Sequence, residues 1–551
     1  MKNLLLLIFN FLVFAATSQT PSSFPGRPRL VVGIVVDQMR QEYLYRYAPK
    51  FGEGGFHRLI NEGFMLSNAH YNYIPTYTGP GHASIYTGTT PASHGIIGND
   101  WFDKKNDKMV NCVEDEKYKP VGSASGNGDV SPWRMLSSTV TDELELATQR
   151  RAKTIGISLK DRGAVLPAGH TPDGAFWYDG TTGKFITSTF YKSALPVWLD
   201  RFNARKLPDT YLNQTWSTLY PIEQYKESGP DNTPYEGLLK EKQQPVFPYD
   251  LKALRKTNGE YDLLASTPFG NDLLTELALA AIDGEEMGKD EWTDFLAISY
   301  SSTDIIGHAA GPNSIEVEDT YLRLDKNIET MLQTLDRTLG QGQYLVFLTS
   351  DHGVADVPQY LKDIHILNPD QEPVRSFENQ LKDHLSSYFP GKEIIKKVSN
   401  GQVFFDHSLF SADPKSSGIE YMVVSELVRN YLLGLEGVAE VYTRQSLLST
   451  DFTAGGMVGM LRRGFHSVQS GDVAVVMAPG WIPGYGLKGS SHGSGYRYDT
   501  HVPVIFYGYG VAQGSSANYH PIIDIAPTLS VLLKIKFPSA ASGQPVTALL
   551  K

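Results

Sequence analysis

The sequence predicts an α/β fold with a largely parallel central sheet flanked by helices, and with further segments inserted into that core. Three observations support this prediction. Several apolar runs continue without regular alternation, as in strands that are covered on both faces. Helical patterns lie between these runs. Two long stretches of different composition interrupt the alternation of strands and helices.

The predicted strands are short, apolar and rich in β-branched residues. They are Leu30–Val36, Phe295–Tyr300, Tyr344–Thr349, Val473–Ala478 and Val502–Tyr507. The clearest predicted helix runs from Ser314 to Leu339, where apolar residues recur at steps of three and four. Ser314 can cap its start, acidic residues fill its first turn, and Gly340 follows its end.

Two stretches are interpreted as insertions into one catalytic domain that spans residues 25–551. Residues from about 105 to 290 are rich in Pro, Gly, Tyr and Trp. Residues from about 365 to 470 follow a separate pattern of helices and strands. A chain of 551 residues is long enough for one large domain with insertions.

The first 18 residues have the pattern of a secretory signal peptide. Lys2 gives a positive start, Leu4–Phe14 is a short apolar run, and Ala16-Thr17-Ser18 resembles a cleavage site. The run is too short to span a bilayer, and no later segment is long enough. We therefore expect a periplasmic or secreted protein. Its only cysteine, Cys112, excludes an internal disulfide.

The formal net charge of −11 disfavours nucleic acid as a partner, because binding to a phosphate backbone requires a basic surface. It does not exclude an anionic small molecule. A local cluster of cationic side chains or metal ions can outweigh the mean charge of the surface.

Acidic and histidine side chains follow the predicted strands at the points where the strands end. They are Asp37, Asp304, His308, Asp351, His352 and, in a late glycine-rich stretch, His492. One such residue alone is more often a turn or cap residue. Ligands of open α/β sheets, however, gather outside the carboxyl ends of the strands. Carboxylate and imidazole donors without thiolate suit catalytic Zn²⁺, and these six side chains would supply two ions.

Residues 74–88, IPTYTGPGHASIYTG, place Thr78 directly before Gly-Pro-Gly. On its own, such a cluster is typical of an ordinary turn. At the same sheet edge, however, a bound metal would lower the pKa of the Thr78 hydroxyl and make it a nucleophile. We expect Gly79 and Gly81 to leave room for a tetrahedral group, and Pro80 to stiffen the turn.

Seven motifs, in this order, resemble the alkaline phosphatase superfamily, and more narrowly its phosphate-irrepressible, PafA-type zinc enzymes. The motifs are VVDQM, PTYTGPGHAS, GIIGNDW, SLKDRGA, SSTDIIGHAAGP, TSDHG and GSSHGSGYRYDTHVP. The resemblance covers nearly the whole mature chain. It implies an alkaline-phosphatase-like core. It also implies hydrolysis of phosphate monoesters through a phosphothreonine intermediate at a two-zinc site, with release of inorganic phosphate.

The resemblance also implies a role for each candidate residue. One zinc would be bound by Asp304, His308 and His492, and the second by Asp37, Asp351 and His352. Thr78 would be the nucleophile and would touch the second metal.

Asn99, Lys160 and Arg162 would bind phosphoryl oxygens, again by resemblance. From charge patterning alone, the Lys-Asp-Arg stretch is more often a solvated loop. His82, like the other histidines near the site motifs, is expected to orient ligands or to serve structure.

Two alternatives stay open. A phosphodiesterase or nucleotide pyrophosphatase on the same core would need a pocket for a second ester group and less positive charge near the phosphoryl oxygens. A secreted protein that binds phosphate or metal without turnover would need no nucleophile. We expect phosphate monoesters as partners, no nucleic acid binding, no membrane span and a monomer.

Overall fold

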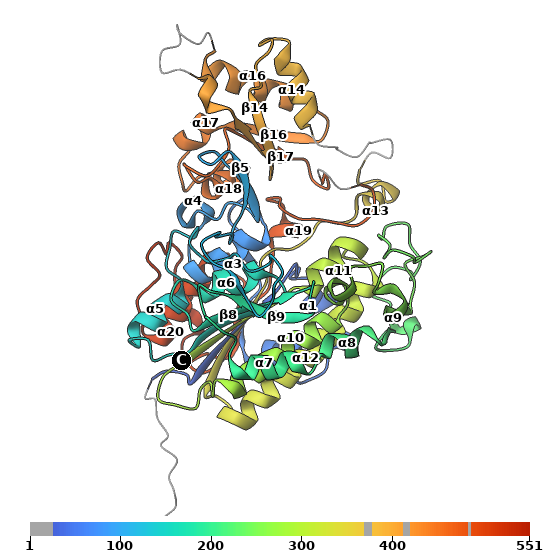
Figure 1. Cartoon of the computed structure of the whole chain (residues 1–551), viewed down its shortest axis with the longest axis vertical. Helices are drawn as coiled ribbons and strands as arrows, with labels where there is room; N and C mark the ends of the chain where they lie inside the picture. The colour runs from blue at the N-terminus through green and yellow to red at the C-terminus, as the bar shows by residue number, and fades with distance from the viewer. Residues whose placement is uncertain (1–25, 368–376, 411–418, 483–485) are drawn as a thin grey trace, which may run out of the picture.

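The computed structural model describes residues 26–367, 377–410, 419–482 and 486–551, so the predicted signal peptide lies outside the described residues. Figure 1 shows a large sheet between layers of helices in the lower part of the view, and a smaller α/β unit at the top. No helix in the described part of the chain combines the length and apolarity needed to cross a bilayer.

Ten strands form the central sheet. They are β1 (Leu30–Val36), β2 (Phe64–Leu66), β6 (Pro120–Val121), β7 (Thr154–Ser158), β8 (Gly174–Asp179), β9 (Lys184–Ser188), β12 (Asp294–Tyr300), β13 (Tyr344–Thr349), β18 (Val504–Gly508) and β19 (Gly514–Ser516). Their order is β19-β2-β18-β13-β1-β12-β7-β8-β9-β6. The strands from β13 to β8 pair in parallel, whereas β18 and β9 pair antiparallel to their neighbours. The predicted largely parallel sheet is therefore confirmed.

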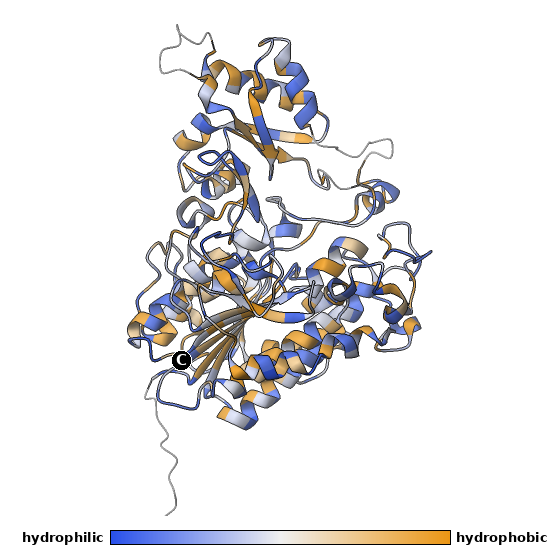
Figure 2. Ribbon diagram, in the orientation of Figure 1, coloured by the Kyte–Doolittle hydropathy of each residue, from blue (hydrophilic) through white to orange (hydrophobic). Residues whose placement is uncertain are grey.

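The central strand β1 is buried along its whole length, as its continuous apolar sequence predicts. Its alternate residues belong to two different cores, with Leu30 and Val32 on one face and Val31 and Val35 on the other. Figure 2 shows the corresponding hydrophobic colour along the strands of this sheet. Because helices cover both faces, functional side chains can reach solvent mainly at the strand ends.

Helices from distant parts of the chain cover the two faces. On one face lie α10 (Phe269–Gly284) and α12 (Ile315–Leu339). On the other lie α3 (Thr78–Thr87), α5 (Val140–Ala147) and α20 (Ile525–Leu533). Helix α12 begins where the sequence predicts, since the Ser314 hydroxyl accepts a hydrogen bond from the Val317 backbone N–H, and Gly340 ends the helix.

A second, four-stranded sheet forms the core of the smaller unit. Its strands are β14 (Ile395–Ser399), β15 (Gln402–Phe405), β16 (Val438–Thr443) and β17 (Val473–Met477), in the order β14-β15-β17-β16. Its helices are α14 (Glu378–Ser386), α16 (Tyr421–Leu433), α17 (Arg444–Ser449) and α18 (Gly456–Gly464). The strand predicted at Val473–Ala478 exists but lies in this second sheet. A continuous apolar run predicts that both faces of a strand are buried, but it does not predict to which sheet the strand belongs.

The stretch from about 105 to 290, interpreted from the sequence as an insertion, overlaps the central sheet. It contains β6, β7, β8 and β9, and it also contains α10, which covers one face. Strand β7 has the sequence TIGIS, in which apolar residues are few and polar residues stand at both ends. It therefore lacks the continuous apolar run by which the other core strands are recognised. The helix α6 (Asp161–Ala168) follows β7 and packs on α3 near the sheet edge.

Candidate active site

Three neighbouring parallel strands carry the candidate ligands to one edge of the central sheet. Asp37 directly follows β1, and Asp351 follows β13 by two residues. Strand β12 leads into α11 (Ser302–Ala310), which carries Asp304 and His308. All of these residues leave the carboxyl ends of β13, β1 and β12, which are adjacent in the sheet. The structure thus brings together residues that are separated by more than 300 positions in sequence.

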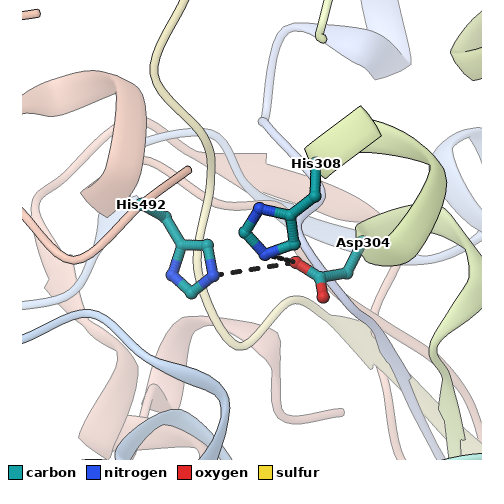
Figure 3. Close-up of side chains that lie close together, drawn as sticks. All are labelled: Asp304, His308 and His492. Carbon is teal, nitrogen blue, oxygen red and sulfur yellow. Dashed lines mark ion pairs between the residues drawn. The ribbon is translucent and has the colours of Figure 1, made fainter. Parts of the chain in front are cut away.

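Asp304, His308 and His492 form the first cluster, drawn in Figure 3. Asp304 and His308 lie one turn apart on α11, with 3.1 Å between His308 Nε2 and Asp304 Oδ1. His492 Nε2 approaches the same carboxylate oxygen at 3.7 Å. His308 Nδ1 donates to the Ser490 carbonyl and His492 Nδ1 to the Thr76 carbonyl. Because a carbonyl only accepts, both imidazoles keep Nε2 as the lone-pair atom that can bind a metal.

Asp37, Asp351 and His352 form the second cluster. His352 Nδ1 donates to the Gly353 carbonyl, which again leaves Nε2 as the lone-pair atom. His352 Nε2 lies 3.4 Å from Asp37 Oδ1 and 3.6 Å from Asp351 Oδ2. Ligand atoms of Asp37, Asp304 and His352 also lie within 4.8 Å of one another. Asp304 therefore faces both clusters and links them into one site.

The electrostatics of these side chains suit divalent cations. Asp37 Oδ1 and Asp351 Oδ2 are buried and have no hydrogen-bond partner within the described ranges. Burial, followed by the charge of Asp37, holds the pKa of Asp351 well above its usual range. Burial lowers the pKa of His352 to about 3, so its imidazole is neutral at physiological pH. Crowded carboxylates and neutral imidazoles are the donor set that a metal ion stabilises, so the residues present fit such ions.

Thr78 begins helix α3 and lies beside the second cluster. Its Oγ1 is 3.5 Å from His352 Nε2. His82, one turn later, contacts the Thr78 carbonyl through Nδ1 and the Ser299 hydroxyl through Nε2. These contacts agree with the expectation that His82 orients the site. The hydroxyl proposed as nucleophile is thus held at the start of a fully buried helix.

The glycines after Thr78 have different surroundings from those expected. A Cβ at Gly81 would come within 2.4 Å of the Asp351 carbonyl, so backbone already fills the space that the sequence interpretation reserved for a tetrahedral group. Gly81 instead allows α3 to approach Asp351 closely. A Cβ at Gly79 would meet Asn99 Oδ1 at 3.2 Å.

Asn99 lies against the start of α3. Its Oδ1 accepts a hydrogen bond of 2.7 Å from the Gly79 backbone N–H, and its carbonyl accepts one from the Cys112 N–H. Fixing Oδ1 in this way also fixes the amide orientation. The Nδ2 group of Asn99 is then left as a hydrogen-bond donor near Thr78.

Lys160 and Arg162 flank the first residue of α6 and carry positive charge to the site. Lys160 Nζ lies 2.7 Å from Asp37 Oδ2 and 2.5 Å from Asp304 Oδ2. Burial opposes its protonated form, but Asp304 and Asp37 outweigh burial and raise its pKa. Lys160, expected to contact phosphoryl oxygens, thus pairs here with two candidate metal ligands.

Arg162 lies within two residues of Lys160. Its Nε is buried without a hydrogen-bond partner in the described structure, and one of its Nη atoms lies 3.8 Å from Asp161. Its pKa is raised although burial opposes the charged form, and Asp37 and Asp304 are among the charges that raise it. The negative charges of the site carboxylates therefore stabilise its protonated guanidinium.

Gln38 is a site residue that the sequence interpretation missed. Its Nε2 donates to Asp304 Oδ1 at 2.6 Å, and its backbone N–H donates to Asp351 Oδ1 at 3.2 Å. It thereby connects candidate ligands of both clusters. Its backbone adopts the left-handed conformation, with φ of 67°. Glutamine belongs to neither the usual turn residues nor the usual zinc ligands. Only its position next to Asp37 could have drawn attention to it.

Residues 31–501 match the type I phosphodiesterase/nucleotide pyrophosphatase family. The chain is 44% identical to alkaline phosphatase PafA of Elizabethkingia meningoseptica, over 95% of each chain. It is also 44% identical to alkaline phosphatase PhoV of Synechococcus elongatus, over 96% of this chain and 95% of that one. A crystal structure of wild-type alkaline phosphatase PafA superposes with a TM-score of 0.91 at 44% identity, covering 96% of this chain and all of that one. The chain therefore belongs to the type I phosphodiesterase/nucleotide pyrophosphatase family, in the branch of the PafA-type alkaline phosphatases.

Proposed function

We propose that this chain is a metal-dependent alkaline phosphatase that hydrolyses phosphate monoesters and releases inorganic phosphate. The observation that carries the proposal is the convergence of six carboxylate and imidazole side chains beside the Thr78 hydroxyl. Relatives that are named alkaline phosphatases, with 44% identity over nearly the whole chain, support the same activity.

Two zinc ions are the metals that best match these donors. The first would be held by Asp304, His308 and His492, and the second by Asp37, Asp351, His352 and Thr78. When bound, such ions act as Lewis acids that neutralise phosphoryl oxygens and lower the pKa of a nearby hydroxyl. Each imidazole supports this role, because its Nδ1 is committed to a backbone carbonyl and its Nε2 faces the carboxylates.

Thr78 is the nucleophile in this proposal. Its Oγ1 forms a bond to phosphorus while the ester P–O bond breaks, the Thr78 proton passes to solvent, and the departing alkoxide takes up a proton. Water then attacks the phosphothreonine, which releases inorganic phosphate and restores the hydroxyl. The N-terminus of α3 favours the anionic phosphoryl group. His82 keeps the Thr78 backbone in place.

Three further side chains would bind the phosphoryl oxygens. Asn99 presents an amide donor, Lys160 a compact charge and Arg162 a planar donor fork. Two partly buried cations suit a monoester dianion better than a diester, which carries one charge fewer. Phosphodiesterase activity, suggested by the family name, is therefore expected as the weaker activity.

The place of action is the periplasm or the extracellular space. This proposal rests on the signal-peptide pattern of the first 18 residues. Aqueous phosphate esters would then reach the site at the sheet edge as small-molecule substrates.

Metal analysis combined with parallel assays tests the proposed function. Prolonged dialysis against a chelator should abolish hydrolysis of a phosphate monoester, and added zinc should restore it at about two ions per chain. The metal-loaded enzyme should cleave the monoester on the order of 10²-fold or more faster than the matching diester, since each lost charge contact costs about 1.5–3 kcal/mol. Activity unaffected by chelation would remove the metal mechanism. Faster diester cleavage would favour a phosphodiesterase.

A further inference from the structure

A cavity of about 90 Å³ lies where the smaller unit meets the active-site loops. One wall is formed by the end of β17 and the segment after it, including Met477 and Trp481. Ile74, Tyr77 and the loop that begins at Ser491 also line the cavity. Figure 1 shows β17 above α3, the helix that Tyr77 directly precedes. Residues of the smaller unit and of the unit that contains the central sheet therefore line the cavity together.

The cavity adjoins the reacting groups on two sides. Tyr77 directly precedes Thr78, and its ring meets the imidazole of His492 edge-on, with 5.4 Å between ring centroids. Asn400, in the β14–β15 turn, also lines the cavity and donates a hydrogen bond to the Asp100 carbonyl. A Cβ on Gly98 would come within 2.4 Å of the Asn400 amide nitrogen.

Asn400 therefore touches both neighbours of Asn99, the expected phosphoryl-binding residue. Two walls of the cavity are continuous with residues placed beside the phosphoryl group.

The chemistry of the walls favours an uncharged, apolar occupant. Met477, Trp481, Ile74 and Tyr77 are among the lining residues of the cavity, and no Lys or Arg is among those that the structure describes. Asp499 also lines it, and burial raises the pKa of this carboxyl group to about 7, so under alkaline conditions it adds negative potential that disfavours a second phosphate group. At about 90 Å³ the cavity is smaller than the roughly 150 Å³ that holds benzene in an enclosed core, but it is open to solvent, so a single ring can lie partly within it.

We propose that this cavity is a leaving-group subsite that accepts the apolar ring of an aryl or arylmethyl phosphate. The inference rests on the proposed phosphatase activity and narrows its substrate class. Sulfur and aromatic side chains suit such a ring, because thioether–aromatic and aromatic–aromatic contacts add to the free energy of apolar burial. The smaller unit would thereby select the alcohol, while the central sheet supplies the chemistry.

Benzyl phosphate and ethyl phosphate provide a matched test, because both release a primary alcohol and differ mainly in the ring. The wild-type enzyme should show a kcat/KM for benzyl phosphate about tenfold or more above that for ethyl phosphate, as expected when an apolar ring is buried. Met477→Ala should lower this ratio about three- to tenfold. Met422→Ala is the control, because Met422 is 49% exposed on α16 of the same unit, and it should leave the ratio unchanged.

A structural readout separates loss of the subsite from a general loss of activity. A crystal of the metal-loaded enzyme with benzylphosphonate, a non-hydrolysable analogue, should show the ring between Met477 and Tyr77. A ring that points to solvent, or a benzyl-to-ethyl ratio near one that Met477→Ala does not change, would overturn the inference. Failure to hydrolyse either ester would instead contradict the proposed function.

Discussion

At the scale of single residues, the hydrogen bond made by Nδ1 of each site histidine determines how its imidazole faces the candidate metal site. The Nδ1 atoms of His308, His352 and His492 all donate to backbone carbonyls, so all three Nε2 atoms face carboxylates. Burial keeps the pKa values of His352 and His492 below their usual range, which maintains the neutral, ligating form. Burial opposes the charged form of His308, but Asp304 outweighs burial and raises its pKa. The fold thus fixes the tautomer of all three imidazoles, and the neutral form of His352 and His492, before any ligand is bound.

Substitution of Thr78 tests the nucleophile. Thr78→Ala removes the hydroxyl oxygen proposed to bond to phosphorus, so kcat/KM for a monoester should fall on the order of 10³-fold or more. Thr78→Ser keeps the hydroxyl and should retain activity within about 10²-fold of wild type, since it loses only a methyl group that restricts χ1. Thr78→Ser should keep both zinc ions, whereas Thr78→Ala loses one proposed ligand of the second ion and should be assayed at saturating zinc. Equal activity of the Ala and Ser variants would contradict the assignment.

The candidate ligands could be predicted because their residue types and positions carry the information. Asp37, Asp304 and Asp351 each follow a recognisable strand, and the ends of parallel strands meet at one edge. The contacts of Gln38 and Gly81 could not be predicted in this way. Both depend on how closely separate segments approach Asp351, and this tertiary distance leaves no local pattern.

At the scale of elements, the end of α11 and the glycine-rich loop after residue 486 act as one unit. Ser490 N–H donates to the His308 carbonyl, while His308 Nδ1 donates to the Ser490 carbonyl. Gly489 N–H donates to the Tyr235 carbonyl from the neighbouring segment. This double connection sets the distance between the helix that carries Asp304 and the loop that carries His492.

Gly489→Ala tests this connection. Gly489 has φ of 70°, and a Cβ there would come within 2.5 Å of the His308 carbonyl, so alanine must displace the helix or the loop. The left-handed conformation alone costs an alanine about 1 kcal/mol. We expect the zinc affinity, measured by competition with a chelator, to fall about tenfold or more.

Gly455→Ala is the matched control, because Gly455 has negative φ and nothing within 4 Å of its Cβ position. It should leave zinc affinity and melting temperature near those of the wild type. If Gly489→Ala bound zinc as tightly as Gly455→Ala, the loop would not position His492.

Elements with a strong periodic pattern could be predicted from sequence almost to the residue. Strand β1 and helix α12 have the bounds that their apolar patterns and caps predict. The sheet to which β17 belongs could not be predicted, because both faces of β17 are buried in the smaller unit. Strand β7 has no continuous apolar run, and its position in the sheet is set by its pairing with β12 and β8. Pairing partners are a property of topology that local sequence does not encode.

At the scale of the whole molecule, a pair of buried carboxyl groups links stability to pH. Glu236 and Glu316 are buried, and each has one oxygen without a hydrogen-bond partner in the described part of the chain. Burial, followed by the charge of Glu316, raises the pKa of Glu236 to about 9. Burial also raises the pKa of Glu316 to about 7, although the Tyr249 hydroxyl opposes this shift by donating to its carboxylate.

These carboxyl groups lie close to the active-site elements. Glu316 belongs to the first turn of α12, and Gly237, next to Glu236, donates its N–H to the carbonyl of Ala309 at the end of α11. Loss of the protonated form of Glu236 would therefore strain the contact between this segment and α11. The effect should appear under the alkaline conditions in which such a phosphatase works.

The sign of the pH effect follows from the raised pKa values. A carboxyl group that holds its proton more tightly in the folded chain contributes stability that is fully present below its unfolded pKa of about 4.3. That stability is lost as pH rises through the folded values of about 7 and about 9. The melting temperature of the metal-loaded protein should therefore fall between pH 5 and pH 9.5. Glu236→Gln removes one titrating group and should make this fall smaller.

Scanning calorimetry across this pH range, with matched zinc loading, measures the effect. Glu53→Gln serves as the control, because the Glu53 side chain is 92% exposed, and its melting temperatures should follow those of the wild type. At pH 9.5 the Glu236→Gln protein should melt above the wild type, because its neutral amide avoids burying a second charge beside Glu316. Parallel curves for Glu236→Gln and wild type would mean that the pair does not hold an extra proton in the folded state.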